Sequence, residues 1–149
     1  MGDTEFSIER LLEQASGNQS AIFLLALRWA KERDGSVDSW ATFLGEQLAP
    51  GWESMRDEGA REVAHIAGLN FACSADSKFA ALEGDAARGE AVIDGPDAQW
   101  LDDTGVSQQD NDRATEFIFG RIAERLGLSF AARRDAAGLH LIFSREPAS

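Results

Sequence analysis

The fold class follows first from one predominantly apolar stretch, Ala21-Ile22-Phe23-Leu24-Leu25-Ala26-Leu27-Arg28-Trp29-Ala30. At 100° per residue this run is apolar around most of a helix, which is typical of a helix buried on several sides or spanning a membrane. A membrane span needs roughly 20 apolar residues, whereas this run is half as long and is followed by charged residues at 31–34. The stretch therefore predicts the central helix of a soluble core, with no membrane as partner.

Signals on either side of this stretch divide the first half of the chain into helices. Residues 16–19 read Ser-Gly-Asn-Gln, a capping-box pattern that predicts a helix start, and Asp34-Gly35 predicts the end of that helix. Apolar residues at 3-4 spacing predict three further helices, over about 7–15, 36–49 and 52–68. The expectation is a layer of four helices over about 7–68.

The pattern changes from helical to β at about residue 70. Two short strands, a helix closed by Gly127 and a hairpin follow in the order ββαββ over about 70–145. Their expected ranges are 79–82, 90–94, 112–126, 128–133 and 139–144. The acidic segment 95–111 is predicted to be a loop. This order of helices and strands predicts an α+β fold of one domain, residues 1–149, with four N-terminal helices packed on a small antiparallel sheet.

Composition indicates a cytoplasmic prokaryotic protein. Cys73 is the single cysteine, so no intramolecular disulfide can form, and the first residues lack the basic and apolar regions of a signal peptide. Arginine far outnumbers lysine beside much alanine, glycine and aspartate, which is typical of a GC-rich prokaryotic genome.

The net charge of −12 excludes nucleic acid as an expected partner, because duplex binding relies on a basic surface. Most of this charge lies in residues 83–112, which carry nine acids and one arginine. One interpretation is a strongly hydrated surface; the other is a surface that attracts a cation or a basic protein. The residues for the second interpretation are Asp94, Asp97, Trp100, Asp102 and Asp103.

Trp100 within this acidic segment has two interpretations of its own. An exposed tryptophan flanked by carboxylates fits a cationic ligand or the arginines of a protein partner. Alternatively, Trp100 folds back and anchors the segment on the core.

A metal site has one weak candidate, Glu58, Glu62 and His65. Glu62 and His65 show the Glu-x-x-His spacing of carboxylate-bridged di-iron bundles, but such sites need two of these pairs projecting inward. On a helical wheel His65 falls in the charged arc, which favours a solvated face. The metal-site hypothesis that remains is a metal ion shared between the two copies of a homodimer. The sequence identifies no cofactor.

Two residues are weak catalytic candidates, His140 and Cys73. His140 lies on a predicted strand, and a general base there would need an orienting carboxylate and a nucleophile within reach. Cys73 stands in no recognisable motif, and single cysteines commonly behave as small apolar side chains. A small hydrolase is therefore a third functional hypothesis, although serine nucleophile elbows and phosphate-binding glycine loops are absent from the sequence.

The layout of the second half resembles a known family. Paired strands, a helix ending in Leu126-Gly127 and a hairpin over 128–145 resemble the 4-vinyl-reductase-type ligand-binding domains related to Golgi-transport proteins. The resemblance implies N-terminal helices packed on a ββαββ unit that hold a small hydrophobic ligand between helices and sheet. Residues 133–140 contain none of the cysteines common in that family, so no binding residue is carried over.

The leading hypothesis is thus a small-ligand-binding or regulatory domain with an apolar pocket between helices and sheet. Its partner is a small apolar ligand, and the sequence leaves room for a homodimer. The alternative is an acidic interaction module, for instance an immunity-like or antitoxin-like inhibitor that binds a basic protein through the Asp-rich segment. The candidate ligand-lining residues are the large aromatics Trp29, Trp40, Trp52, Phe71, Phe117 and Phe143.

Overall fold

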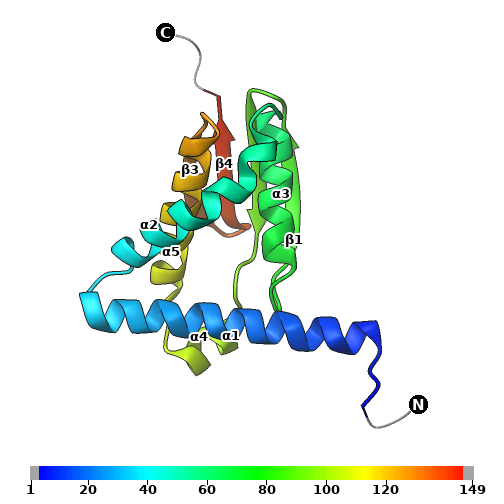
Figure 1. The fold of residues 1–149 in the computed structure, drawn as a ribbon, viewed down its shortest axis with the longest axis vertical. Helices are drawn as coiled ribbons and strands as arrows, with labels where there is room; N and C mark the ends of the chain where they lie inside the picture. The colour runs from blue at the N-terminus through cyan, green and yellow to red at the C-terminus, as the bar shows by residue number, and fades with distance from the viewer. Residues whose placement is uncertain (1–3, 146–149) are drawn as a thin grey trace.

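Three α-helices and one 3-10 helix precede the first strand in the computed structural model, which describes residues 4–145. Two further helices separate two pairs of strands (Figure 1). In chain order the elements are α1 (Ile8–Asp34), α2 (Asp38–Leu48), η1 (Ala49–Met55), α3 (Ala60–Ala72), β1 (Phe79–Gly84), β2 (Arg88–Ile93), α4 (Ala98–Thr104), α5 (Gln108–Arg125), β3 (Ser129–Asp135) and β4 (Gly138–Ser144).

The α+β class and the antiparallel sheet are confirmed, whereas the predicted number and order of helices are wrong. The expected fourth helix begins at Ala60 instead of near Trp52, because Pro50 and Gly51 direct the chain into the 3-10 segment η1. The expected loop 95–111 contains α4 and the first turn of α5. The second half is therefore ββααββ rather than ββαββ.

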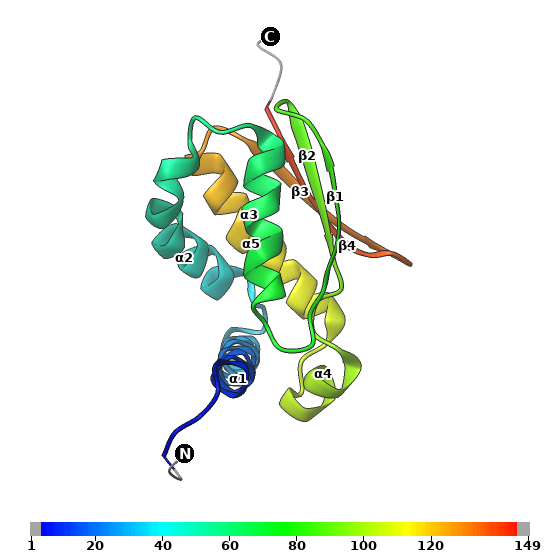
Figure 2. The same ribbon diagram turned by 90° about the vertical axis from the view of Figure 1, so that its right-hand side faces the viewer.

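The sheet has the strand order β1-β2-β4-β3, and every neighbouring pair is antiparallel. α3 and α5 cover one face of this sheet, and Figure 2 shows the other face free of helices. Because side chains alternate along a strand, β2 and β4 direct one set towards the helices and the other outwards. The inward set is buried and comprises Ala91, Ile93, Leu139, Leu141 and Phe143.

α1 is one continuous helix, so the predicted break at residues 16–19 is wrong. Ser7 caps its start by accepting a hydrogen bond from the Arg10 amide (3.2 Å). The Ser16 hydroxyl donates to the Leu12 carbonyl within the helix instead of capping a new one. Gly17 lies under Trp100, whose ring would be 3.9 Å from a Cβ at that position. Gly35, with φ of 76°, ends the helix as predicted.

The predicted central position of residues 21–30 is also wrong. α1 lies across one end of the molecule (Figure 1). Its residues Leu24 and Leu27 are buried against the rest of the fold, whereas Trp29, on the opposite side of the helix, is 57% exposed. The core instead forms where α3 and α5 meet the sheet. An apolar run in the sequence indicates that a helix has apolar surface, but it does not indicate how many neighbouring helices or strands cover that surface.

Candidate functional site

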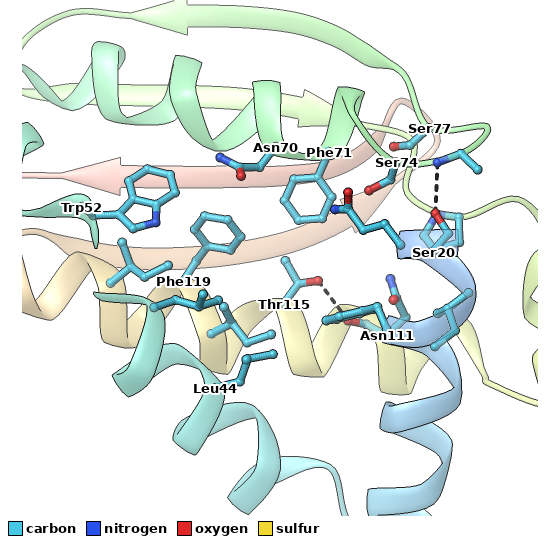
Figure 3. A pocket seen from close by; sticks show the side chains of 18 residues that line it. Ser20, Leu44, Trp52, Asn70, Phe71, Ser74, Ser77, Asn111, Thr115 and Phe119 are labelled. Carbon is cyan, nitrogen blue, oxygen red and sulfur yellow. Dashed lines mark hydrogen bonds between the residues drawn. The ribbon is translucent and has the colours of Figure 1, made fainter. Parts of the chain in front are cut away.

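A pocket of about 370 Å³ lies among α1, α2, α3 and α5 (Figure 3). Its volume is within the range of roughly 300–1,000 Å³ that small-molecule sites occupy. No sheet residue lines it, because Phe143 and its neighbours already fill the space between helices and sheet. The apolar wall consists of Phe23, Leu24, Leu44, Leu48, Trp52, Phe71, Ile118, Phe119 and Ile122.

Polar side chains gather at the end of the pocket away from Trp52 (Figure 3). The Ser20 hydroxyl accepts a hydrogen bond from the Ala75 amide (3.0 Å), and the Thr115 hydroxyl donates to the Asn111 carbonyl (3.0 Å). The Ser77 hydroxyl is buried and has no hydrogen-bond partner within the described residues 4–145. A buried hydroxyl without a partner costs free energy, so this end of the pocket favours a ligand with a hydrogen-bonding group.

None of the residues that line this pocket is charged. Burying an ionised ligand without an opposite charge would carry a large desolvation cost. Uncharged serine, threonine and asparagine side chains instead suit a hydroxyl, amide or carbonyl group. The geometry therefore suits an uncharged molecule with an apolar body and one polar end.

The structure brings two of the predicted lining residues, Trp52 and Phe71, into this pocket. The other four predicted residues lie elsewhere. Trp29 is exposed on α1 under the guanidinium of Arg33, and Trp40 packs against Phe23, with ring centroids 5.5 Å apart. Phe117 lies under Arg113, and Phe143 is fully buried over the sheet.

Sequence reasoning missed the polar end of the pocket. Ser20 is only 8% exposed on α1 although it is polar. Ser107 caps α5 by accepting from the Asp110 amide, and Asn111 lies buried in the first turn of that helix. The usable signal was the presence of polar residues on otherwise apolar helix faces, and only the packing shows that they meet.

His140 lies on the open face of the sheet between two carboxylates. Its Nε2 is 2.9 Å from Asp135 Oδ1, and its Nδ1 makes a short contact with Glu90 Oε1. Arg133 Nη2 is 3.4 Å from the same Glu90 oxygen, and Arg88 pairs with Glu90 at 2.8 Å. Both ring nitrogens of His140 lie beside a carboxylate, an arrangement that favours the imidazolium form because both nitrogens then donate.

The cluster sets the pKa values of its members. The hydrogen bond to Glu90 raises the pKa of His140, against the opposing effect of burial, and the bond to Asp135 adds to the increase. The bond from His140 lowers the pKa of Glu90 and of Asp135. Because its pKa is raised, protonated His140 stabilises the fold fully below pH 6.5. This stabilisation is lost as the pH rises through the pKa of His140 in the folded protein. The lowered carboxyl pKa values stabilise above about pH 4.5 and lose their effect on acidification.

We expect His140→Gln to lower the free energy of unfolding by about 1–2 kcal/mol between about pH 4.5 and pH 6.5, because two charge-assisted hydrogen bonds are lost. The difference from the wild type should shrink as pH rises above the folded pKa of His140. Urea unfolding over a pH series measures it. His65→Gln, at an exposed position on α3, is the matched control and should have little effect. A difference that is the same at every pH would contradict the ion-pair assignment.

The remaining catalytic and metal candidates are not brought together. Cys73 is exposed at the C-terminal cap of α3, whereas the His140 cluster is built on the strands of the sheet. Glu62 and His65 form an exposed pair on α3 at 3.4 Å, and the Glu58 carbonyl accepts from Arg145. Within residues 4–145, no group of three His, Cys, Asp or Glu side chains is placed to hold a metal ion.

The acidic segment is largely engaged in its own fold. Asp97 caps α4 by accepting from the Trp100 amide (2.9 Å), and Trp100 Nε1 donates to Asp76 (2.8 Å). The Trp100 ring packs against the core, which is the anchoring interpretation given above. Asp103 accepts from Gln99 (2.7 Å), and Asp94 and Asp102 are exposed.

No family model, curated protein or solved structure matches this chain. The resemblance in layout to 4-vinyl-reductase-type domains therefore stays a prediction. No helix within the described residues is both long and apolar enough to cross a membrane.

Proposed function

We propose that this protein binds a small, uncharged, largely apolar molecule in the pocket among α1, α2, α3 and α5. The observation that carries the proposal is an apolar pocket of about 370 Å³ whose one polar end includes the buried, unpartnered hydroxyl of Ser77. Ligand sites commonly combine apolar walls with a few polar groups that fix orientation.

The lining residues indicate how the ligand lies. Trp52, Phe71 and Phe119 offer aromatic surface to its apolar body, and the Phe71 and Phe119 rings pack with centroids 5.6 Å apart. Its polar group lies beside Ser77 and Asn111. Exposed residues at Gln19, Leu48 and Asn70 form the rim, so the ligand enters between α1 and the C-terminal ends of α2 and α3.

Binding can be tested with N-phenyl-1-naphthylamine, an uncharged apolar fluorophore, by titrating its emission with the protein. We expect saturable binding that Leu44→Trp weakens by about tenfold or more, a loss of about 1.4 kcal/mol. Leu44 is half-buried in the pocket wall, and an indole there would occupy space that the probe needs.

Phe43→Trp is the matched control, because Phe43 is the neighbouring residue on α2 but is 59% exposed and outside the pocket. It should bind the probe as the wild type does. Equal binding by the Leu44→Trp and Phe43→Trp variants would show that the probe binds elsewhere and would contradict the proposal. Native mass spectrometry of freshly purified protein adds an independent test, since a natural ligand appears as extra mass that denaturation removes.

The same titration separates the pocket from the acidic-module alternative. Asp102→Asn with Asp103→Asn removes two exposed charges of α4 and leaves the Asp97 cap intact. Pocket binding should be unchanged in this double variant.

A further inference from the structure

An apolar stripe on α1, broken near its middle by Asn18 and Gln19, faces away from the rest of the molecule. On a helical wheel it lies opposite the buried residues Leu24 and Leu27. In Figure 2, which looks nearly along α1, the sheet and the other helices lie above this helix and to one side of it. The stripe spans about 32 Å at 1.5 Å per residue. Its large side chains are 50–73% exposed and comprise Ile8, Leu11, Leu12, Ile22, Leu25 and Trp29.

The N-terminal third of α1 projects beyond the body of the protein. Residues 4–15 are all exposed, and Arg10 pairs with Glu13 at 2.9 Å within the helix itself. A short helix without tertiary packing is marginally stable in water. About two turns of projecting helix with an apolar stripe therefore call for a covering partner.

The stripe is complementary to itself in reverse order. When two copies of α1 are aligned antiparallel about a midpoint between Asn18 and Gln19, each stripe residue faces either another stripe residue or an alanine. The alanines Ala15 and Ala26 fit the same alignment on the apolar face. The facing pairs are Ile8 with Trp29, Leu11 with Ala26, Leu12 with Leu25, and Ala15 with Ile22. A self-complementary patch of this kind is what a two-fold symmetric interface requires.

The charges of α1 favour the antiparallel over the parallel arrangement. Residues 4–19 carry three glutamates and one arginine, whereas residues 20–34 carry three cations and two acids. Antiparallel packing sets the acidic half of one helix beside the basic half of the other. Parallel packing would set acidic beside acidic.

We propose that this protein forms an antiparallel homodimer through the apolar stripe of α1. The stripe offers on the order of 600 Å² of apolar side-chain surface per copy, near the roughly 800 Å² that each partner buries in a standard interface. The inference is independent of the pocket, although Gln19 lies both at the proposed midpoint and at the pocket rim.

Sedimentation equilibrium of the full chain tests the dimer. The wild type should sediment at twice the chain mass of 16.2 kDa. Leu12→Glu should weaken dimerisation by about a hundredfold or more, because it sets a charge in the apolar interface. Leu12 is 63% exposed in the projecting turns, so the body should fold normally, which far-ultraviolet circular dichroism checks.

Leu69→Glu is the matched control, since Leu69 is 51% exposed but lies on α3. It should remain dimeric. A wild type that stays monomeric at 100 μM, or a Leu12→Glu variant that remains dimeric, overturns the proposal. So does a monomer that sediments with phosphatidylcholine vesicles, because the stripe would then bind a lipid surface.

Disulfide crosslinking in a Cys73→Ser background tests the orientation. Asn18→Cys, beside the proposed two-fold axis, should crosslink two copies. Ile8→Cys should not, because the antiparallel arrangement separates the two copies of residue 8 by about 32 Å along the helix. Crosslinking by Ile8→Cys as efficient as that by Asn18→Cys would indicate parallel helices and overturn the antiparallel assignment.

Discussion

Replacing Phe143 by alanine is expected to lower the free energy of unfolding by about 3–5 kcal/mol, the usual cost of deleting a buried phenylalanine ring. Phe143 is 0% exposed on the inward face of β4. Its ring contacts Phe130 at a centroid distance of 4.9 Å and Phe119 edge-on at 6.2 Å. The change removes apolar burial and leaves a cavity where α5 meets the sheet.

Urea unfolding followed by circular dichroism measures this loss. Phe43→Ala removes an equally large ring from an exposed site and should change the stability by much less. Because Phe119 also lines the pocket, Phe143→Ala should weaken binding of the fluorescent probe as well. A loss below 1 kcal/mol would mean that this part of the core collapses freely around the missing ring.

Gly89→Ala is the second substitution with a large expected effect, about 3 kcal/mol of destabilisation, at the upper end of the usual cost of overpacking. A Cβ at Gly89 would lie 2.4 Å from both the Ala60 carbonyl oxygen and the Arg61 Cα. Both are backbone atoms of the first turn of α3, so no side chain can rotate away.

α3 cannot simply move to accommodate this Cβ. Its first amides, of Ala60 and Arg61, donate to the carbonyls of Ala86 and Asp85 in the β1–β2 turn at 2.9 and 3.0 Å. A shift of the helix would break these bonds. Gly120→Ala is the matched control: nothing lies within 4 Å of its Cβ position in α5, and alanine should stabilise the helix by about 0.5–1 kcal/mol. An unchanged unfolding midpoint for Gly89→Ala would show that α3 lies farther from β2.

Local signals predicted the elements they control directly. Gly35 and the hairpin turn at residues 135–138 end and reverse the chain as expected, and the alternating apolar residues of 139–144 form β4. These predictions succeeded because positive φ at glycine and period-two alternation are properties of the backbone and its nearest neighbours.

Signals that depend on competing partners were misread. Ser16 and Gln19 form a valid capping pattern, but apolar contacts from Leu24 and from Trp100 over Gly17 favour one continuous helix. Residues 95–111 looked like a loop because they are acidic, although Asp97 and Ser107 are ordinary helix caps. The helix-capping residues Asp97 and Ser107 are therefore better indicators of α4 and of the start of α5 than the acidic composition of the segment.

Some residues of the candidate pocket could be predicted from the sequence, and others could not. Trp52 and Phe71 were predictable as large apolar side chains seeking burial, whereas Ser20, Asn111 and Ser77 are separated widely in sequence and meet only when α1, α5 and the segment after α3 pack together. The ion pairs of His140 likewise depend on the register between β2 and β4, which no local pattern specifies.

The sequence by itself determined the α+β class, the antiparallel hairpins, the end of α1 and the presence of enough apolar surface for a core. Only the tertiary structure decided which apolar faces are covered, that α1 lies at the edge with its stripe exposed, and that the pocket opens among helices. The physical reason is that secondary structure responds to interactions within a few residues, whereas burial, cavities and ion pairs depend on which distant surfaces pack most closely.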